Sequence, residues 1–433
     1  MSAKKVLIIT YYWPPSGGVG VQRWLHFAIN LNKLGFEPVI YTPEKPQFEI
    51  LDESIVDLVA DIEVLKKPIW EPFAFFHKLT KNKNKVTQGT VLEKPKQTLK
   101  DKLFIWIRGN FFIPDPRVFW VKPSVKFLGK YLLENKINTI ITTGPPHSMH
   151  LIGLGLKKSI NHLKWLADFR DPWSDWDILQ KLNTSALAMS RHRFLEKRVL
   201  ENANVVLTVS KRLGKSLQEK MNDKVNVQVI MNGIASSHSE KPVYTSYEKF
   251  VIGYFGMLNE LRDPETLWLA LEQLCAEKPE IHDRLEIRLG GIVSESIADR
   301  LKSSEYLSDK VVFLGYVAHE DVFAEYRKCN ILLLLLNKSD NAKWILPVKF
   351  FEYLSAYRPI LTLGPKDSDL GDILQENNIG EMMSGIDLDE IKKFILSNFE
   401  SKYKVDDSHY QRLLSSHSRE SQAAELATLI DRL

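Results

Sequence analysis

The sequence contains very little cysteine and no long apolar run. Its 433 residues include two cysteines, Cys275 and Cys329, whose wide separation suits neither a disulfide framework nor a zinc-binding cluster. The longest aliphatic run, residues 331–336, is far shorter than the roughly 20 residues that cross a membrane. The early stretch VLIITYYWPP is interrupted by prolines and offers no signal-peptide cleavage site. These absences lead us to expect a cytoplasmic protein without disulfides or transmembrane helices.

The sequence has no large excess of charge, but its positive charge is concentrated in one segment. The formal net charge is +4, and 44% hydrophobic with 26% charged residues is ordinary for a globular protein. Residues 66–130 contain fifteen Lys and Arg against four Asp and Glu, so this segment alone carries about +11. No recognised nucleic-acid-binding module accompanies this charge, so we do not expect nucleic acid as a partner.

The same segment is rich in aromatic residues, in the stretches WEPFAFF and LFIWIRGNFFIPDPRVFW. Clustered cations with bulky aromatics are typical of peripheral attachment to an anionic membrane surface. The alternative is an inserted subdomain whose aromatics form a core and whose lysines are solvated.

Short β-rich apolar runs alternate with helical patterns along the chain, which predicts an α/β fold with parallel sheets covered on both faces. The first series of predicted strands comprises residues 6–10, 37–42, 139–143, 164–169, 205–210 and 227–231. The second series comprises residues 250–256, 285–291, 311–316, 331–336 and 359–364. The polar stretch ASSHSEKPVYTSY at 235–247 separates the two series and predicts a linker.

We therefore predict two doubly wound, Rossmann-like domains, at residues 1–235 and 248–409. Residues 410–433 carry apolar side chains at helical spacing. They predict a closing helix that packs back on the N-terminal domain.

A glycine cluster follows the first predicted strand, in the stretch YYWPPSGGVGVQRW at 11–24. It does not fit a dinucleotide fingerprint, because Arg23 stands where the third glycine is needed and the predicted second strand closes on Thr42 and Pro43 rather than on an acidic residue. It does not fit a phosphate loop either, since the Gly-Lys-Ser/Thr ending is missing. Gly17, Gly18 and Gly20 still allow backbone N–H groups to approach an anion at a helix N-terminus. The alternative is a turn that needs glycine only for its shape.

Two further loops of the first domain carry candidate site residues, because ligands of such folds bind at the carboxyl ends of strands. GPPHSMH at 144–150 presents His147 just ahead of a predicted helix, where an imidazole can bind a substrate hydroxyl or simply pack. DFRDPWSDW at 168–176 contains Arg170 and Asp171, which suit hydroxyl recognition and an internal ion pair equally well.

The second domain has its own pair of loops. GMLNELRDP at 256–264 places Arg262 close to the start of a predicted helix. In ILPVKFFEYLSAYRP at 345–359, Lys349 and Glu352 are three residues apart, so both project from one helix face. A surface ion pair is the alternative explanation for that spacing. The preceding WILP suggests instead a rigid entry that brings helix N–H groups toward an anion.

Eight stretches, taken in order, resemble the retaining glycosyltransferases of the GT-B fold, of the family 4 type (glycosyltransferase group 1). They are YYWPPSGGVGVQRW, TTGPPHSMH, ADFRDPW, LEKRVLENANVVLTVSKRL, VIMNGI, GYFGMLNELRDPETL, VVFLGYVAHEDV and LPVKFFEYLSAYRPIL. The resemblance implies two Rossmann-like domains facing across a cleft, with a nucleotide-diphosphate sugar on the second domain and the acceptor on the first. It also implies chemistry without a metal or other cofactor, in cell-surface polysaccharide or lipopolysaccharide synthesis. We expect such an enzyme in the cytoplasm, peripherally at the inner face of the cell membrane.

The resemblance also implies residue roles. Glu352 matches a carboxylate that accepts from the ribose hydroxyls, while Arg262 and Lys349 lie where the diphosphate charge is neutralised. The other implied donor-binding residues are Gly17, Gly18, Gly256 and Pro347; the implied catalytic residues are His147, Arg170 and Asp171; the implied acceptor-binding residues are Asp168 and Trp173.

The sequence departs from the family pattern at two positions. Trp344 stands where the first acid of the paired-glutamate motif is expected, so the contacts to the donor sugar's hydroxyls have no assigned residue. Met257 stands where many members have arginine. Two alternatives to a transferase remain: a sugar-nucleotide epimerase of GT-B architecture, and a non-catalytic GT-B scaffold at the membrane.

Overall fold

The computed structural model describes residues 4–46, 48, 50–71, 99–234, 248–400 and 407–433. The chain divides into two compact units, one comprising Met1–Met231 with Arg419–Leu433 and the other comprising Asn232–Ser418. The predicted linker at 235–247 lies outside the described residues.

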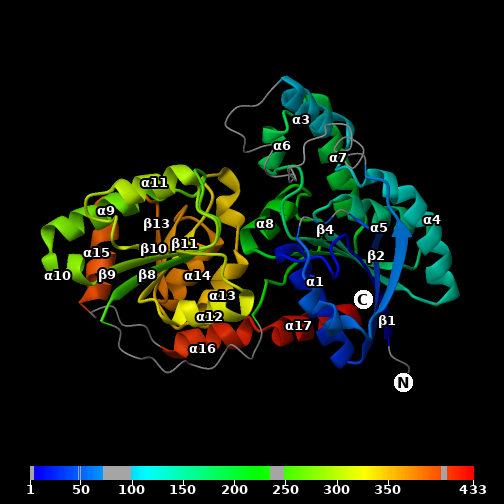
Figure 1. Cartoon of the computed structure of the whole chain (residues 1–433). Coiled ribbons are helices and arrows are strands. Elements are labelled where there is room, and N and C mark those ends of the chain that lie inside the picture. The colour runs from blue at the N-terminus through cyan, green and yellow to red at the C-terminus, as the bar shows by residue number, and fades with distance from the viewer. Residues whose placement is uncertain (1–3, 47, 49, 72–98, 235–247, 401–406) are drawn as a thin grey trace. The chain divides into compact units, whose positions relative to one another are not determined.

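The first unit is built on a sheet of seven parallel strands in the order β3-β2-β1-β4-β5-β6-β7 (Figure 1). The strands are β1 (Lys4–Ile9), β2 (Phe36–Glu44), β3 (Glu63–Pro68), β4 (Thr139–Gly144), β5 (Lys164–Phe169), β6 (Val205–Thr208) and β7 (Val227–Val229). Every residue of β4 is buried, as expected of a central parallel strand with helices on both faces.

Helices cover this sheet on both faces. The helices of this part of the chain are α1 (Val19–Lys33), α3 (Leu99–Phe111), α4 (Val118–Glu134), α5 (Ser148–Ser159), α6 (Ile178–Lys181), α7 (Ala186–Asn202) and α8 (Lys211–Glu219), of which α3 and α6 form a small cluster of their own. Two short 3-10 turns, Glu53–Ile55 and Asp57–Val59, lie between β2 and β3. Apolar side chains of α1 such as Trp24 and Leu25 pack against Val6 and Ile8 of β1 to form the core.

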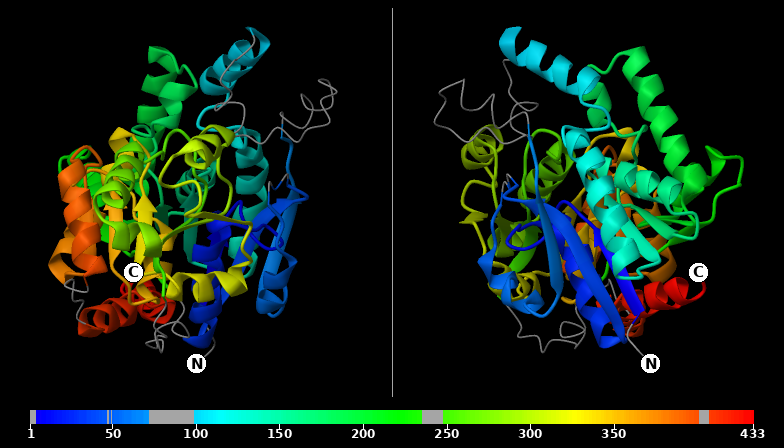
Figure 2. Two further views of the ribbon diagram at one scale, coloured as in Figure 1. Left: turned by 60° about the vertical axis from the view of Figure 1, so that its left-hand side comes forward. Right: turned by 90° about the vertical axis from the view of Figure 1, so that its right-hand side faces the viewer.

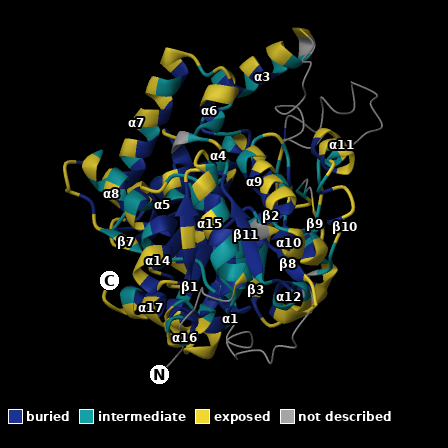
Figure 3. Cartoon of the chain, turned by 90° about the vertical axis from the view of Figure 1, so that its left-hand side faces the viewer, coloured by how far each residue is buried: buried dark blue, intermediate teal, exposed yellow. Residues whose placement is uncertain are grey.

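The second unit is built on six parallel strands in the order β10-β9-β8-β11-β12-β13. The strands are β8 (Phe250–Phe255), β9 (Leu285–Gly290), β10 (Val311–Gly315), β11 (Ile331–Leu335), β12 (Ile360–Leu363) and β13 (Gly380–Met383). The helices are α9 (Glu265–Glu277), α10 (Pro279–Arg284), α11 (Glu295–Ser303), α12 (His319–Arg327), α13 (Val348–Leu354), α14 (Asp369–Asn377), α15 (Leu388–Phe399) and α16 (Asp407–Ser416), with a 3-10 turn at Asp340–Trp344. Figure 3 shows buried strands beneath helices whose outer faces are exposed.

The end of the chain forms two helices where the sequence predicts one. Helix α16 belongs to the second unit and buries Tyr410, whose hydroxyl donates to the Ile379 carbonyl at 3.1 Å. Helix α17 (Arg419–Asp431) belongs to the first unit, where Leu426 and Ile430 join the core beside α1 (Figure 2). The helix is interrupted at His417 and Ser418, where Ser418 leaves the helical path and pairs with Ile234.

Both sheets have the strand order of doubly wound folds, which confirms the predicted fold class. In each sheet the order reverses at one place, between β1 and β4 in the first unit and between β8 and β11 in the second. Ligands of such sheets bind beyond the carboxyl ends of the strands at this reversal. The loops after β1 and β4, and after β8 and β11, are therefore the places to look for a site. No helix in the described part of the chain is long and apolar enough to cross a bilayer.

Candidate functional site

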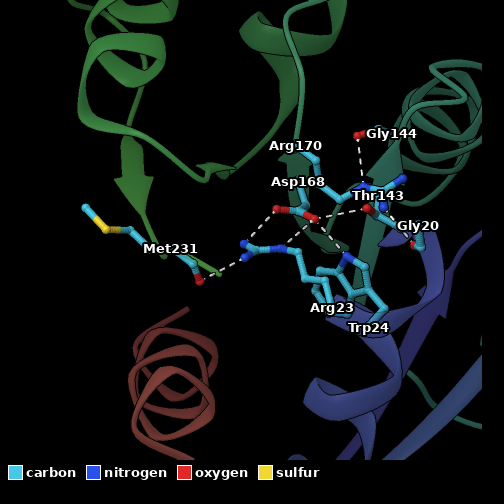
Figure 4. A network of polar contacts seen from close by, with 8 residues as sticks. All are labelled: Gly20, Arg23, Trp24, Thr143, Gly144, Asp168, Arg170 and Met231. Carbon is cyan, nitrogen blue, oxygen red and sulfur yellow. Dashed lines mark hydrogen bonds and ion pairs between the residues drawn. The ribbon is translucent and has the colours of Figure 1, made fainter. Parts of the chain in front are cut away.

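Arg170, in the loop after β5, connects the two loops at the strand-order reversal of the first unit. Its side chain follows β5 and donates to three backbone carbonyls, those of Gly20 at 2.7 Å, Pro145 at 2.6 Å and Gly144 at 3.3 Å. Figure 4 shows two of these carbonyls, one from the start of α1 and one from the end of β4. The guanidinium therefore fixes the glycine loop relative to the loop that carries His147. Its predicted catalytic role stays a prediction.

Asp168 is fully buried, and its carboxylate is occupied by the first unit's own side chains (Figure 4). It accepts from Arg23 at 3.0 and 3.3 Å, from Trp24 Nε1 at 2.7 Å and from Thr143 Oγ1 at 2.9 Å. These bonds hold α1 against β4 and β5, and they explain why arginine stands at position 23. A contact between Asp168 and an acceptor stays a prediction, while its observed contacts are internal.

The glycine loop after β1 has features of both interpretations that its sequence allows, a turn shaped by packing and a helix N-terminus that suits an anion. The Gly17 N–H donates to the Ile50 carbonyl at 2.9 Å, and a Cβ at Gly17 would lie 2.8 Å from Ile50 Cγ2, so Gly17 is needed for packing. Gly18 has a φ of 79° and precedes α1, whose N-terminus has no side-chain cap and no acidic residue in its first turn. The first-turn N–H groups of α1 therefore suit an anion at this end of the helix.

His147 is 4% exposed and stacks on Trp173, with ring centroids 4.9 Å apart and an interplanar angle of 7°. Within the described residues neither ring nitrogen of His147 forms a hydrogen bond of good geometry, although the Pro172 backbone lies close enough to raise the pKa of His147 slightly. Burial lowers the pKa of His147 well below its usual value, and the nearby His150, His192 and Arg170 lower it further. His147 is therefore neutral near pH 7, with one ring nitrogen a donor and the other an acceptor, and its predicted catalytic role stays a prediction.

Trp173 is 1% exposed and donates from Nε1 to Nδ1 of His192 at 3.1 Å, so a hydrogen bond and the stacking contact with His147 both fix its ring. Its predicted contact with an acceptor stays a prediction. Burial also raises the pKa of Asp171, and the charge of Arg170 partly offsets that rise. The structure thus brings His147, Arg170, Asp171 and Trp173 to one region beyond β4 and β5.

Sequence reasoning missed the residue that caps the helix after His147. Asp115 accepts from the Ser148 backbone N–H and from Ser148 Oγ, both at 2.8 Å, so its carboxylate lies at the N-terminus of α5. No local pattern reveals this cap, because Asp115 precedes Ser148 by 33 positions in the chain.

In the second unit the loops after β8 and β11 are linked directly. Arg262 Nε donates to Asn337 Oδ1 at 2.6 Å, and the Lys338 backbone N–H donates to the Leu261 carbonyl at 3.1 Å. A Cβ at Gly256 would lie 3.4 Å from Lys349 Cε, so the end of β8 adjoins the Lys349 side chain. Asn337 is the partner that sequence reasoning missed.

Lys349 and Glu352 lie on α13, which begins directly after Pro347. Burial lowers the pKa of Lys349, the charge of Glu352 raises it and the charge of Arg262 lowers it, so the three charges lie within electrostatic reach of one another. Both residues are half-buried, which does not fit a surface ion pair. Glu352 Oε2 accepts from the Tyr326 hydroxyl at 2.9 Å. Tyr326 is a further residue of the site that sequence patterns did not reveal.

Trp344, which occupies the position of the expected acid, ends the 3-10 turn before α13. The Lys343 ammonium lies 5.4 Å from the centroid of its ring. The structure therefore places an aromatic side chain and a cation at this position. It assigns no carboxylate there.

The chain is similar in fold to several proteins of known structure. The chain is 13% identical to the Anabaena protein Alr3699/HepE, crystallised in complex with UDP, over 99% of this chain and 100% of that one with a TM-score of 0.62. It is 12% identical to the lipopolysaccharide outer core galactosyltransferase WaaB, over 99% and 100% of the two chains with a TM-score of 0.60. It is 10% identical to a putative UDP-N-acetylglucosamine 2-epimerase from Listeria monocytogenes, over 99% and 96% of the chains with a TM-score of 0.56. No protein-family model and no curated protein matches the sequence.

These likenesses extend over nearly the whole length of each chain, and they establish that the protein has the GT-B fold. The resemblance inferred from the eight sequence stretches is confirmed to that extent. Identities this low show the fold alone, so the reaction is a matter for proposal.

Proposed function

We propose that the protein is a glycosyltransferase that moves a sugar from a nucleotide-diphosphate sugar to a glycan or lipid-linked acceptor, with retention of configuration. The observation that carries this proposal is the grouping of Arg262, Lys349 and Glu352 at the strand-order reversal of the second sheet. Two cations beside one carboxylate suit a ligand that joins a diphosphate to a ribose.

The reaction places negative charge on a leaving nucleotide diphosphate, and fixed cations stabilise that charge as it develops. Arg262 is held in place by Asn337, and Lys349 is held by burial, so neither cation needs to reorganise during the reaction. Glu352 accepts hydrogen bonds from the ribose hydroxyls. The leaving phosphate itself takes the proton from the attacking hydroxyl of the acceptor substrate. In the first unit, His147 is the neutral group that binds a hydroxyl of the transferred sugar or of the acceptor.

Uridine diphosphate sugars are the first donors to test, because HepE was crystallised with UDP. A role in cell-surface polysaccharide or lipopolysaccharide synthesis is supported by the likeness to WaaB. We propose that the transfer needs no metal ion and no cofactor. The two cations would then provide the neutralisation that a divalent metal supplies in other enzymes.

The test is a product assay by mass spectrometry with uridine and guanosine diphosphate sugars, with and without a panel of glycan and lipid-linked acceptors. We expect a glycosylated acceptor whose formation resists EDTA and falls strongly in His147→Ala. The exposed His162→Ala is the matched control and keeps full activity.

Other outcomes of this assay would contradict the proposal in identifiable ways. An isomerised sugar formed from donor alone would point to an epimerase. Donor binding without any product would point to a non-catalytic scaffold. A strict requirement for a divalent metal would refute the metal-independent mechanism.

A further inference from the structure

Three helical segments of the first unit form a small projection with its own core. We call α3, α6 and the first half of α7 (residues 186–194) the helical knob; Figure 1 shows these helices grouped together. Ile105, Leu179 and Leu182 form its buried cluster, which is separate from the core of the sheet. Asn110 fastens the end of α3 to the start of α7, because it donates to the Asn183 carbonyl at 3.1 Å and accepts from the Ser185 N–H at 2.8 Å.

The outer surface of the knob is apolar to an unusual degree. Six of its large apolar side chains are exposed, namely Leu99 (85%), Leu103 (59%), Trp106 (42%), Phe111 (68%), Leu187 (84%) and Phe194 (47%). Single exposed apolar residues are ordinary, but a group of this size on one small projection marks an interaction surface.

The exposed side chains of α3 follow the helix period. Leu99, Leu103 and Trp106 are spaced four and three residues apart, so they form one stripe. Ile105 lies on another side of the helix and is buried in the small core. The Trp106 and Phe111 rings lie 5.7 Å apart, which extends the apolar surface to the end of α3. Helix α3 is therefore anchored by one face and exposes a second apolar face.

The same projection is strongly cationic. Its three segments contain six Lys and Arg against one Asp. Lys102, Lys181, Arg191 and Arg193 are exposed. On α7, the guanidinium of Arg191 lies 5.3 Å from the centroid of the Phe194 ring. On α7, cations and apolar side chains therefore lie side by side.

We propose that the helical knob docks this protein on an anionic lipid bilayer, with its apolar side chains in the interface and its cations on the lipid head groups. Anionic lipids attract the cations, and the acyl-chain boundary accepts the apolar side chains. A second copy of the knob is a poor alternative occupant, since two surfaces of the same charge repel each other. The inference rests on the proposed function only for its purpose, which is to bring the enzyme to a lipid-linked acceptor.

The proposed membrane surface differs from the segment 66–130 that the sequence predicts for this role. Part of that segment is core, because Trp120 is 1% exposed and stacks on Tyr41 with centroids 4.7 Å apart. Residues 72–98 lie outside the described residues. Helix α7 lies beyond this segment of the sequence, yet it contributes Leu187, Arg191 and Arg193 to the exposed surface of the helical knob.

The test is flotation of the full chain with phosphatidylcholine vesicles, either neutral or containing about 30% phosphatidylglycerol. We expect the protein to float with the anionic vesicles at about 0.1 M salt, and to float much less with neutral vesicles or at about 1 M salt. The pairs L103Q/W106Q and R191Q/R193Q should each lower the partition coefficient about tenfold or more.

The matched controls lie in the second unit. Ile292 and Ile386 are exposed at 69% and 83%, so I292Q/I386Q removes as much exposed apolar surface elsewhere. Equal recovery with both vesicle types, no recovery at all, or equal loss in the knob and control variants would overturn the proposal. Flotation uses no substrate, so its failure is separate from failure of the transferase assay. Unchanged thermal unfolding of the variants would show that they are folded.

Discussion

Two buried or half-buried carboxylates illustrate how a side chain's existing bonds decide its role. Asp168 accepts from three side chains of its own unit, which stabilise its charge inside the core. Glu352 is half-buried and accepts from Tyr326 at Oε2. Glu352 can therefore accept a hydrogen bond from a ligand hydroxyl far more easily than Asp168 can.

Tyr326 should control how well Glu352 recognises ribose. Its hydroxyl holds Oε2, so we expect Tyr326→Phe to weaken binding of the cognate nucleoside diphosphate about tenfold, as for loss of one bond to a charged group. The weakening should be smaller for the corresponding deoxyribose nucleotides. Calorimetry with both nucleotide types measures the difference, with Glu352→Gln as the reference. Equal weakening for both types would assign Tyr326 to packing.

The buried histidines should make the stability of the first unit depend on pH. Burial lowers the pKa of His150 to about 3 and of His192 to about 4, and it lowers the pKa of His147 well below its usual value. The unfolded chain binds more protons than the folded chain once the pH falls below about 6.5, so stability is full above that pH and falls below it.

We expect the free energy of unfolding to fall between pH 7.5 and 5.5, by up to about 1.4 kcal/mol per pH unit for each histidine below pH 6.5. Urea unfolding at the two pH values measures the change. His192→Gln should reduce the pH dependence, whereas a change at the exposed His162 should not. A free energy that is the same at both pH values would contradict these pKa directions.

At the scale of elements, the sequence predicted the buried strands and missed two at sheet edges. β3 and β13 each pair with one neighbour only, so they need less apolar side-chain surface than central strands. The EVLKKP sequence of β3 is largely exposed, and β13 has only the four residues GEMM, so neither presents an apolar run. The eleven predicted strands, by contrast, lie at or near the observed ones because each contributes an apolar run.

The loops of the candidate site were predictable because strand order places them together. The sequence located Gly256, Arg262, Lys349 and Glu352 through the rule that ligands bind beyond strand ends. It did not reveal Asn337 or Tyr326, because each acts through a bond to a residue distant in the chain.

The turn after β9 shapes the loop of Gly256. Gly291 has a φ of +107°, and a Cβ there would lie 2.3 Å from the Gly256 carbonyl oxygen. We expect Gly291→Ala to cost about 1–3 kcal/mol and to weaken nucleotide binding, because the loop after β8 must move. Chemical unfolding and calorimetry measure the two effects.

Gly35→Ala is the matched control for this substitution. Gly35 has a φ of +88°, but a Cβ there would meet nothing within 4 Å. It should cost about 1 kcal/mol from backbone strain and leave nucleotide binding unchanged. Nucleotide binding by Gly291→Ala equal to that of the wild type would show that Gly291 does not shape the nucleotide site.

At the scale of the whole molecule, the chain leaves the first unit at Met231 and returns to it at Arg419. Apolar periodicity predicted that the end of the chain is helical, but it did not reveal the break between α16 and α17. That break depends on the pairing of Ser418 with Ile234, which is a contact between distant parts of the sequence.

Helix α17 should stabilise the first unit specifically. Leu426 is fully buried in the core that α1 also lines, so we expect Leu426→Ala to cost about 2–5 kcal/mol. Hydrogen exchange should increase in β1 and α1 and stay unchanged in β8. Thr428→Ala, on the exposed side of the same helix, is the control. Faster exchange in β8 rather than in β1 would contradict this assignment.

Calorimetry with UDP, GDP, ADP and their common sugar conjugates measures directly whether the second unit holds a nucleotide. The second unit groups Arg262, Lys349 and Glu352, so we predict that one nucleotide class binds selectively. Glu352→Ala should weaken that binding about tenfold or more, while the exposed Glu280→Ala should not. No binding to any nucleotide, or equal binding by the wild type and Glu352→Ala, would contradict the proposed donor site.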